Sequence, residues 1–318
     1  MPEPVEYILD DGKYVLFDDI AEGAGDTRIW RGATRDGDDV VVKVLPIPRD
    51  HELHEKREGY FKDEVECGKS LQSPHIRRFI DSGLVRDAKP LGYPRGIWYL
   101  VFEYIAFGSL RTLLENRSLL PAEVRDLALA LTAGLSVAHG RHVRHRDLKP
   151  ENILLPDGRT DLAKIADFGI ARTQDGTKLT TTGRWIGTAS YMAPEQFKDS
   201  SAVDERADIY SLALILWECL CNHVPYDCGD ANLTAEARLA SQPLGDLEAN
   251  GRRLRETSAA LRQALDRNPL RRPGNAEALC DIFVEAGSRD NLWEPRPRSF
   301  TPASLVDYLK NRGLRVIK

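Results

Sequence analysis

The chain has 318 residues, of which 42% are hydrophobic and 29% are charged, as is typical of a soluble globular protein with a substantial core. The formal net charge of −5 argues against a general nucleic-acid binder, and the longest apolar run, 212–217, is too short to cross a bilayer. The acidic N-terminal residues contain no apolar core and the five cysteines are scattered, so we expect a cytoplasmic protein without a membrane or nucleic-acid partner.

The first part of the chain predicts a small β-rich unit. Residues 14–44 are predicted to form three strands joined by turns, and the glycine-containing segment 20–26, taken alone, is a hairpin turn. The strand at 40–44 reads VVVKV and carries a single lysine, Lys43. A lysine on an exposed edge strand is common, so Lys43 alone does not indicate a function, and only the later motifs suggest one.

A helix and a further strand follow this unit. The helix is predicted at about 58–71 and carries Glu64. Gly68 lies one turn later, where glycine costs about 1 kcal/mol relative to alanine, and we expect it to leave a gap in the packing. The aromatic and β-branched run at 98–105 predicts the next strand. A helix with an apolar stripe then begins at Pro121, where a missing N–H does no harm.

The most informative stretch reads HRDLKPEN, at 145–152. Pro150 lacks an N–H and fixes its own φ, so this segment is predicted to be a loop. It presents the carboxylate of Asp147, the ammonium of Lys149 and the amide of Asn152. This set suits phosphoryl transfer, which needs a base for a hydroxyl, a cation for the moving phosphoryl group and a ligand for Mg²⁺.

Further motifs follow in order, and the whole series resembles one family. The later motifs are ADFG at 166–169, GTASYMAPE at 187–195 and an apolar helix at 204–220. With the earlier stretches they resemble the Hanks-type (eukaryotic-like) serine/threonine protein kinases, and the wording of the motifs is similar to that of bacterial members.

The resemblance implies an α+β, bilobal protein-kinase fold. It implies a small β-rich N-lobe with helix C at 1–103, a large mainly helical C-lobe at 104–286, and ATP between them. A C-terminal extension at 287–318 with a short helix is not covered by the resemblance. That extension either docks on its own domain or binds a partner.

Residue roles are carried over from the family motifs. Asp147 would act on the substrate hydroxyl, Lys149 would stabilise the γ-phosphate, and Asn152 and Asp167 would hold Mg²⁺. Lys43, held by Glu64, would reach the ATP phosphates. The other implied ATP-binding residues are Ala21, Gly23, Gly25, Ile29, Val41, Glu103, Ile105, Ser109 and Leu154. Structural or regulatory roles are implied for Arg146, Phe168, Thr180, Thr181, Thr182, Thr188, Glu195, Asp208 and Arg272.

Two of these residues depart from the family pattern. Ala21 stands where the family usually has its first glycine, and no register gives three glycines at the usual spacing. Val41 is bulkier than the usual alanine, so the adenine pocket is expected to be tighter. Phe102 would control access to the space behind that pocket.

The expected function is transfer of the γ-phosphate of ATP to serine and threonine hydroxyls of protein substrates, with Mg²⁺ as cofactor. Autophosphorylation by another copy in a transient dimer is expected at Thr181 or Thr182, whereas Thr188 is interpreted as structural. One alternative is a pseudokinase that binds ATP without efficient transfer, which the irregular glycine segment and Gly68 would favour. Another is a small-molecule kinase, although such enzymes usually lack the complete segment from Asp167 to Glu195.

A zinc site is a separate alternative near the end of the apolar helix. Cys219, Cys221, His223 and Cys228 lie close together in the chain and are residue types that bind zinc. The first two cysteines end a helix that is otherwise apolar. A thiol in that position usually serves as a small hydrophobic group.

Overall fold

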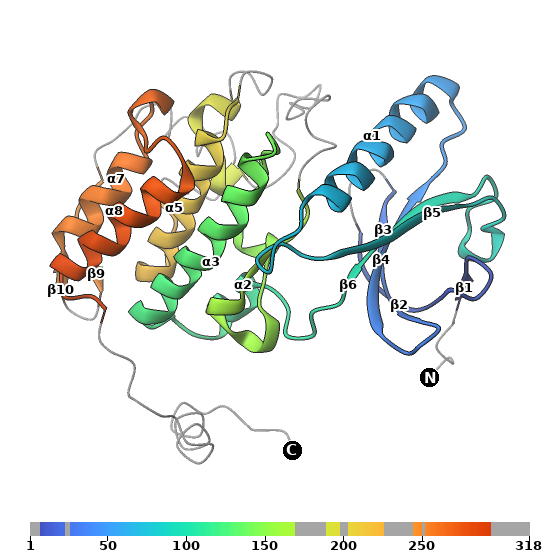
Figure 1. Ribbon diagram of the computed structural model, residues 1–318, viewed down its shortest axis with the longest axis horizontal. Helices are drawn as coiled ribbons and strands as arrows, with labels where there is room; N and C mark the ends of the chain where they lie inside the picture. The colour runs from blue at the N-terminus through green and yellow to red at the C-terminus, as the bar shows by residue number, and fades with distance from the viewer. Residues whose placement is uncertain are drawn as a thin grey trace, which may run out of the picture.

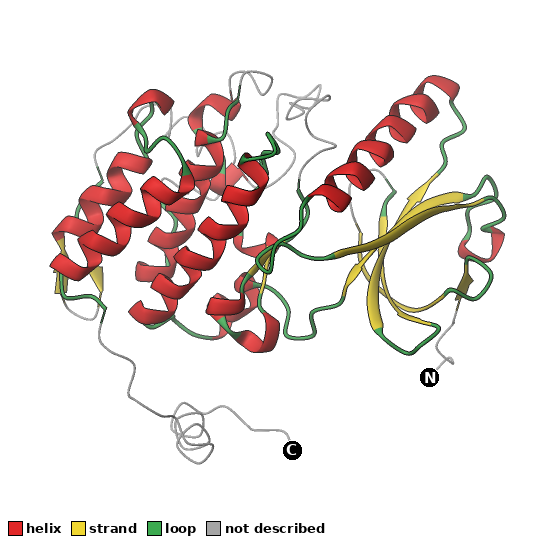
Figure 2. Cartoon of the chain, in the orientation of Figure 1, coloured by secondary structure: helices red, strands yellow, loops and turns green. Residues whose placement is uncertain are grey.

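The computed structural model describes residues 7–22, 26–168, 189–197, 203–225, 244–249 and 252–293. They form two lobes, one built on a curved β-sheet with a single long helix beside it and the other mainly helical (Figure 1). Colouring by secondary structure shows most strands in one lobe and most helices in the other (Figure 2). The expected bilobal α+β fold is therefore confirmed.

The small lobe is an antiparallel six-stranded sheet in the order β1-β2-β3-β4-β6-β5. Its strands are β1 (Tyr7–Leu9), β2 (Tyr14–Glu22), β3 (Arg28–Thr34), β4 (Asp39–Pro46), β5 (Phe79–Val85) and β6 (Ile97–Glu103). The three strands expected between residues 14 and 44 are present, and β1 and β5 are additional. Lys43 on β4 lies opposite Leu100 on β6, so the lysine sits on a central strand of the sheet and not on an edge.

Helix α1 (His51–Ser70) begins earlier than its apolar pattern predicted. Asp50 caps it, because the Oδ1 atom of Asp50 accepts a hydrogen bond from the backbone N–H of Leu53 at 2.8 Å. Near its start the helix packs on Trp98 of β6, whose ring lies 5.1 Å from that of His54 and 5.9 Å from that of Phe61. These contacts attach the first half of α1 to the sheet.

The expected gap at Gly68 is reduced by another side chain, and a cavity of about 40 Å³, lined by Gly68, Glu64 and Phe168 among others, remains. A Cβ atom placed on Gly68 would lie 2.8 Å from both Cγ and Cδ2 of Phe79, the first residue of β5. Such distances are shorter than carbon atoms tolerate. The aromatic ring therefore lies directly against the glycine backbone, and α1 approaches β5 closely.

The large lobe is organised around α5 (Arg206–Cys221), which is apolar on almost every face and buried from Ala207 to Cys219. Among the described residues of this lobe, the other helices are α2 (Leu110–Asn116), α3 (Pro121–His139), α7 (Arg255–Ala264) and α8 (Ala276–Arg289). Two short hairpins complete it: β7 (Ile153–Leu154) with β8 (Lys164–Ile165), and β9 (Leu247–Ala249) with β10 (Arg252–Leu254). No helix in the described part of the chain is long and apolar enough to cross a bilayer.

The C-terminal end of the described chain packs on the large lobe. The indole N–H of Trp293 donates to the carbonyl of Val284 at 2.7 Å, and its ring lies 5.4 Å from that of Phe283. The short helix expected between residues 300 and 313 lies outside the described residues.

Candidate active site

A buried carboxylate holds the start of the loop 145–152. Asp208, on α5, accepts hydrogen bonds at 2.8 Å from the backbone N–H groups of His145 and Arg146. Its Oδ2 atom also lies 2.9 Å from Nε2 of His139. Burial alone would raise the pKa of Asp208, but the hydrogen bond and charge of His139 together with the contacts of His145 bring it below its ordinary value. Asp208 therefore stays ionised and fixes the backbone immediately before Asp147.

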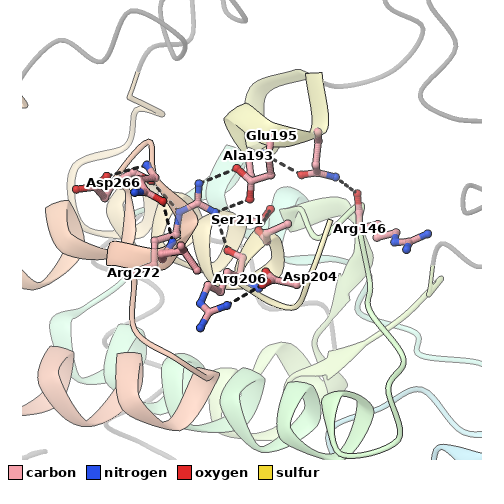
Figure 3. A network of polar contacts seen from close by, with 12 residues as sticks. Arg146, Ala193, Glu195, Asp204, Arg206, Ser211, Asp266 and Arg272 are labelled. Atoms are coloured by element: carbon pink, nitrogen blue, oxygen red, sulfur yellow. Dashed lines mark hydrogen bonds and ion pairs between the residues drawn. The ribbon is translucent and has the colours of Figure 1, made fainter. Parts of the chain in front are cut away.

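Arg146 shows why this support is needed. Its φ of 62° lies in the left-handed region, which non-glycine residues seldom occupy. Its N–H is held by Asp208, and its carbonyl accepts a hydrogen bond at 2.9 Å from Nε2 of Gln196 (Figure 3). The two contacts keep the peptide groups on both sides of Arg146 in this strained turn.

Three side chains of the loop converge on one small space. Nζ of Lys149 lies 3.4 Å from Oδ2 of Asp147. The amide nitrogen of Asn152 donates to the carbonyl of Asp147 at 2.8 Å and lies 3.4 Å from its Oδ2 atom. Because the nitrogen of Asn152 is occupied in this way, its side-chain oxygen is left to accept from a donor or bind a cation.

Asp167 reaches the same space from the β7–β8 hairpin. Ile153 pairs with Ile165, and the N–H of Ala166 donates to the carbonyl of Asn152 at 2.8 Å. Asp167 follows directly, with an exposed side chain and a left-handed φ of 56°. The backbones of Asn152 and Asp167 are thus held close together by the hairpin, and both side chains carry oxygens of the kind that Mg²⁺ prefers. The residues present fit a magnesium site.

Phe168 anchors this turn under α1. Its ring centroid lies 4.9 Å from that of His145, whose Nε2 atom lies 2.8 Å from the carbonyl oxygen of Ala166. On its other side Phe168 packs against a buried cluster that includes Cys67 and Leu71 from the end of α1. The position of Asp167 is therefore tied to both the loop 145–152 and the end of α1.

Lys43 and Glu64 are in contact, as the motif spacing predicted. Nζ of Lys43 lies 2.6 Å from Oε1 of Glu64, and the two side chains are 22% and 12% exposed. Burial lowers the pKa of Lys43, but the charges of Glu64 and Asp167 and the hydrogen bond to Glu64 outweigh it, so the pKa is raised overall. Lys43 is therefore a fixed positive charge facing Asp167.

Several expected ATP-binding residues lie on the central strands. Val41 is buried on β4 and lies opposite Phe102 on β6, and Ala21 lies opposite Ile29 across the β2–β3 pair. Ile105 is half-buried just after β6. The backbones of Ser109 and Leu154 form an isolated bridge, so both lie where β6 gives way to the large lobe.

Two of the expected ATP contacts are already engaged with protein groups. The hydroxyl of Ser109 caps α2, accepting from the N–H of Thr112 at 3.3 Å. The carbonyl of Glu103, expected to face the adenine edge, accepts a hydrogen bond at 3.0 Å from Nε of Arg77. A carbonyl oxygen has two lone pairs and keeps one acceptor position. The hydroxyl of Ser109 could serve a ribose only together with its capping role.

Arg77 is the residue of this site that sequence reasoning missed. Besides its bond to Glu103, its guanidinium lies 5.4 Å from the centroid of the Phe102 ring. Burial lowers the pKa of Arg77, against the opposing charges of Asp167 and Glu103. In the sequence HIRRFI nothing distinguishes this arginine from its exposed neighbour Arg78, so no local signal predicted the contact.

A bidentate ion pair holds separate segments of the large lobe together. Both Nη atoms of Arg272 bond the two carboxylate oxygens of Glu195, at 2.6 and 2.7 Å. Arg272 also donates to the carbonyls of Arg206 and Asp266 at 2.9 and 2.8 Å, and it lies 4.8 Å from the centroid of the Tyr210 ring (Figure 3). Its side chain is fully buried, so this one guanidinium joins three separate segments of the large lobe.

Two of the cysteines considered for a zinc site pack in α5. Cys219 is buried in α5, and the thiol of Cys221 donates to the carbonyl of Trp217 at 3.1 Å, as expected for packed helical cysteines. The predicted residues that are not described are Gly23, Gly25, Thr180, Thr181, Thr182, Thr188 and Cys228.

Comparisons with known proteins point to one family. The family model described as protein kinase domain matches residues 22–284. The chain is 32% identical over 297 residues to serine/threonine-protein kinase pkn3 of Myxococcus xanthus, covering 90% of this chain and 52% of that protein. It is 34% identical over 234 residues to serine/threonine-protein kinase PknL of Mycobacterium tuberculosis, covering 73% of this chain and 55% of PknL.

A solved structure supports the fold. The crystal structure of Rad53 in complex with AMP-PNP aligns with a TM-score of 0.63 at 19% identity, over 86% of this chain and 66% of that one. The chain spans about half the length of the two curated relatives above.

Proposed function

Because this chain belongs to the protein kinase family, we propose that it is a serine/threonine protein kinase that uses ATP and Mg²⁺ to phosphorylate protein substrates. One observation carries the proposal: the loop 145–152 holds Asp147 against Asn152, the β7–β8 hairpin places Asp167 beside that loop, and Lys43, paired with Glu64, lies near enough to Asp167 for their charges to interact. The named kinase relatives give the serine/threonine class.

The loop supplies the groups that act on the phosphoacceptor. Asp147 would orient the substrate hydroxyl and accept its proton, and Lys149 would place positive charge beside the phosphoryl group during transfer. Lys43 would bind the α- and β-phosphates, and its raised pKa keeps it charged near neutral pH. Bound Mg²⁺ would neutralise charge on the β- and γ-phosphates, and Asn152 and Asp167 are the residues that would hold it.

The test is a phosphotransfer assay with γ-labelled ATP and a serine- and threonine-containing peptide library. We expect Mg²⁺-dependent label on serine and threonine, and its loss in Asp167→Ala without loss of the folded state. Asp281→Asn, an exposed carboxylate on α8, is the matched control and should keep wild-type turnover. Near-wild-type transfer by Asp167→Ala would contradict the assignment of the metal-binding residue.

We further propose that the kinase is switched on by autophosphorylation in a transient dimer. A cavity of about 570 Å³ lies between α1 and the start of the catalytic loop, lined by Arg141, Arg144 and Arg146 among others. Within the described residues, no acceptor lies within hydrogen-bond distance of Nε or Nη1 of Arg146. A phosphorylated threonine from 180–182 would provide the oxygens that such arginines bind, and so order the segment next to Asp147.

This second part has its own test. We expect peptide mapping after incubation with Mg²⁺ and ATP to find phosphate at Thr181 or Thr182. A variant with Thr180, Thr181 and Thr182 all changed to alanine should fold normally and phosphorylate peptides more slowly. Full activity in that variant would exclude the switch, whether or not phosphate is found on the wild-type chain.

A further inference from the structure

The contact between α1 and the sheet at Gly68 has an unusual form. The Cβ atom that any other residue would bring to position 68 would meet not only the Cγ and Cδ2 atoms of Phe79 at 2.8 Å but also its Cβ atom at 3.0 Å. A change of rotamer could move Cγ and Cδ2. It could not move Cβ, which the backbone of β5 fixes. Only a separation of α1 from β5 would relieve the overlap.

Phe79 is itself held firmly by the sheet. It lies opposite Phe102 in the β5–β6 register, and the two rings meet edge to face with centroids 5.7 Å apart. Phe102 in turn contacts the guanidinium of Arg77. The ring of Phe79 is therefore flanked on one side by aromatic and cationic groups of the sheet and on the other by the backbone of Gly68.

The position of this contact matters because of what lies one turn away. Glu64 and Gly68 are four residues apart and share a face of α1. Glu64 reaches Lys43 on β4, and β4 pairs with β6, which pairs with β5 and Phe79. The Lys43–Glu64 and Gly68–Phe79 contacts are thus two neighbouring attachments of the same helix to the same sheet.

We propose that Phe79 is a positioning residue for the phosphotransfer reaction, and that it acts only because residue 68 is glycine. The ring takes the place of a side chain on α1 and sets the distance at which Glu64 meets Lys43. This inference rests on the proposed kinase function. An added Cβ at position 68 needs roughly 0.4–0.6 Å of displacement to reach an ordinary carbon–carbon contact with Phe79, and that shift would draw Glu64 away from Lys43.

The chain offers a matched control on the same helix. Gly59 also lies in α1, but a Cβ atom placed on it would meet nothing within 4 Å. Gly59→Ala should therefore keep wild-type kinetics and be neutral or slightly stabilising, because alanine is the better helix former. Gly68→Ala makes the same chemical change at the crowded position.

The experiment is a double-mutant cycle with Gly68→Leu, Phe79→Ala and both together, assayed by kinetics and by thermal unfolding. We expect Gly68→Leu alone to lower kcat/KM by about tenfold or more. The double variant should recover most of that loss, because the leucine side chain can occupy the space that the ring vacates. If Gly68→Leu does not fold, the cycle of Gly68→Ala with Phe79→Leu gives the same comparison with smaller changes.

Two results would overturn the proposal. One is a double variant as impaired as the product of the single variants, since independent effects mean that the residues are not coupled. The other is Gly68→Ala with the same kinetics and stability as Gly59→Ala. A wild-type protein that fails to transfer phosphate would instead defeat the proposed function, while the coupling in thermal unfolding would still report whether the contact exists.

Discussion

At the scale of single residues, the site depends on buried charges whose partners come from distant parts of the chain. Asp208 lies sixty-odd positions after the loop it holds, and Glu64 lies twenty-one positions after Lys43. Burial is the largest single influence on the pKa of both Asp208 and Lys43. The charged and hydrogen-bonding partners together outweigh it, so both groups stay charged. Removing one partner should therefore cost more than removing a surface charge.

The first prediction concerns the charge on Glu64. Glu64→Gln keeps the shape and a hydrogen-bonding oxygen but removes the charge that holds Lys43, so we expect kcat/KM to fall about tenfold or more. Thermal stability should fall as well, because the buried ammonium of Lys43 loses its charged partner, but the hydrogen bond that glutamine can keep makes this loss smaller than the loss of turnover. Glu55→Gln, an exposed change on the same helix, is the control. Unchanged kinetics in Glu64→Gln would mean that α1 is not positioned for catalysis by this pair.

The second prediction is a pH dependence set by Asp208. Its pKa is lowered from the ordinary value of 3.8, so its stabilising effect is fully present above that value and is lost as pH falls through the lower folded-state pKa. Asp208→Asn should lower the free energy of unfolding by about 1.5–3 kcal/mol near neutral pH, as expected for lost charge-assisted hydrogen bonds.

Urea unfolding of both proteins between pH 7 and pH 3 measures this effect. The difference in the free energy of unfolding should be constant down to about pH 5 and shrink below pH 4. A difference that grows as the pH falls would contradict this role for Asp208.

At the scale of elements, the structure shows both the reach and the limits of the sequence analysis. Hydrophobic pattern and motif order predicted the helix at 121–139 and the loop 145–152, because local residue types determine them. The gap expected at Gly68 is reduced to a small cavity, because Phe79, which comes from another element, takes the place of a side chain there. Sequence periodicity carries no information about which side chain of a neighbouring element enters a space.

The start of α1 and the bond of Arg77 were missed for related reasons. The first two turns of α1 are polar and exposed, so only the Asp50 cap marks where the helix begins. Arg77 looks like any surface arginine until the fold places it beside the carbonyl of Glu103. Contacts of this kind depend on tertiary structure and not on local propensity.

The third prediction concerns Arg272, the arginine that joins three segments of the large lobe (Figure 3). Arg272→Ala should lower the free energy of unfolding by about 3 kcal/mol, since it removes a buried bidentate pair and leaves Glu195 without its partner. Arg272→Lys should recover only part of this, because an ammonium cannot make the two parallel bonds.

Arg272→Lys thus tests whether charge at this place is enough, and Arg271→Lys is its control, because Arg271 is the exposed neighbour and should tolerate the change. Chemical denaturation of the three variants provides the comparison. Equal stability of Arg272→Lys and the wild type would show that the fork geometry contributes nothing.

At the scale of the whole molecule, the two lobes are joined next to the reaction site. The segment that follows α1 pairs with β8: the N–H of Arg77 donates to the carbonyl of Ile165 at 2.8 Å, and the N–H of Ile165 donates to the carbonyl of His75 at 2.9 Å. Gly134 of α3 permits this approach, because a Cβ there would lie 2.7 Å from the carbonyl oxygen of His75. The segment that follows α1 is thus anchored two residues before Asp167, so we expect a shift of the helix to move Asp167.

The measurement that tests the central claim most directly compares nucleotide binding with phosphotransfer in Asp147→Asn. The account predicts that this variant keeps the increase in thermal stability that Mg²⁺ and ATP give to the wild type, because Asp147 acts on the acceptor hydroxyl and not on the nucleotide. Transfer of γ-labelled phosphate should fall by about 10²–10⁴-fold, the usual contribution of a general base. Transfer at the wild-type rate by Asp147→Asn, or a wild-type chain that binds ATP and transfers no phosphate, would contradict it.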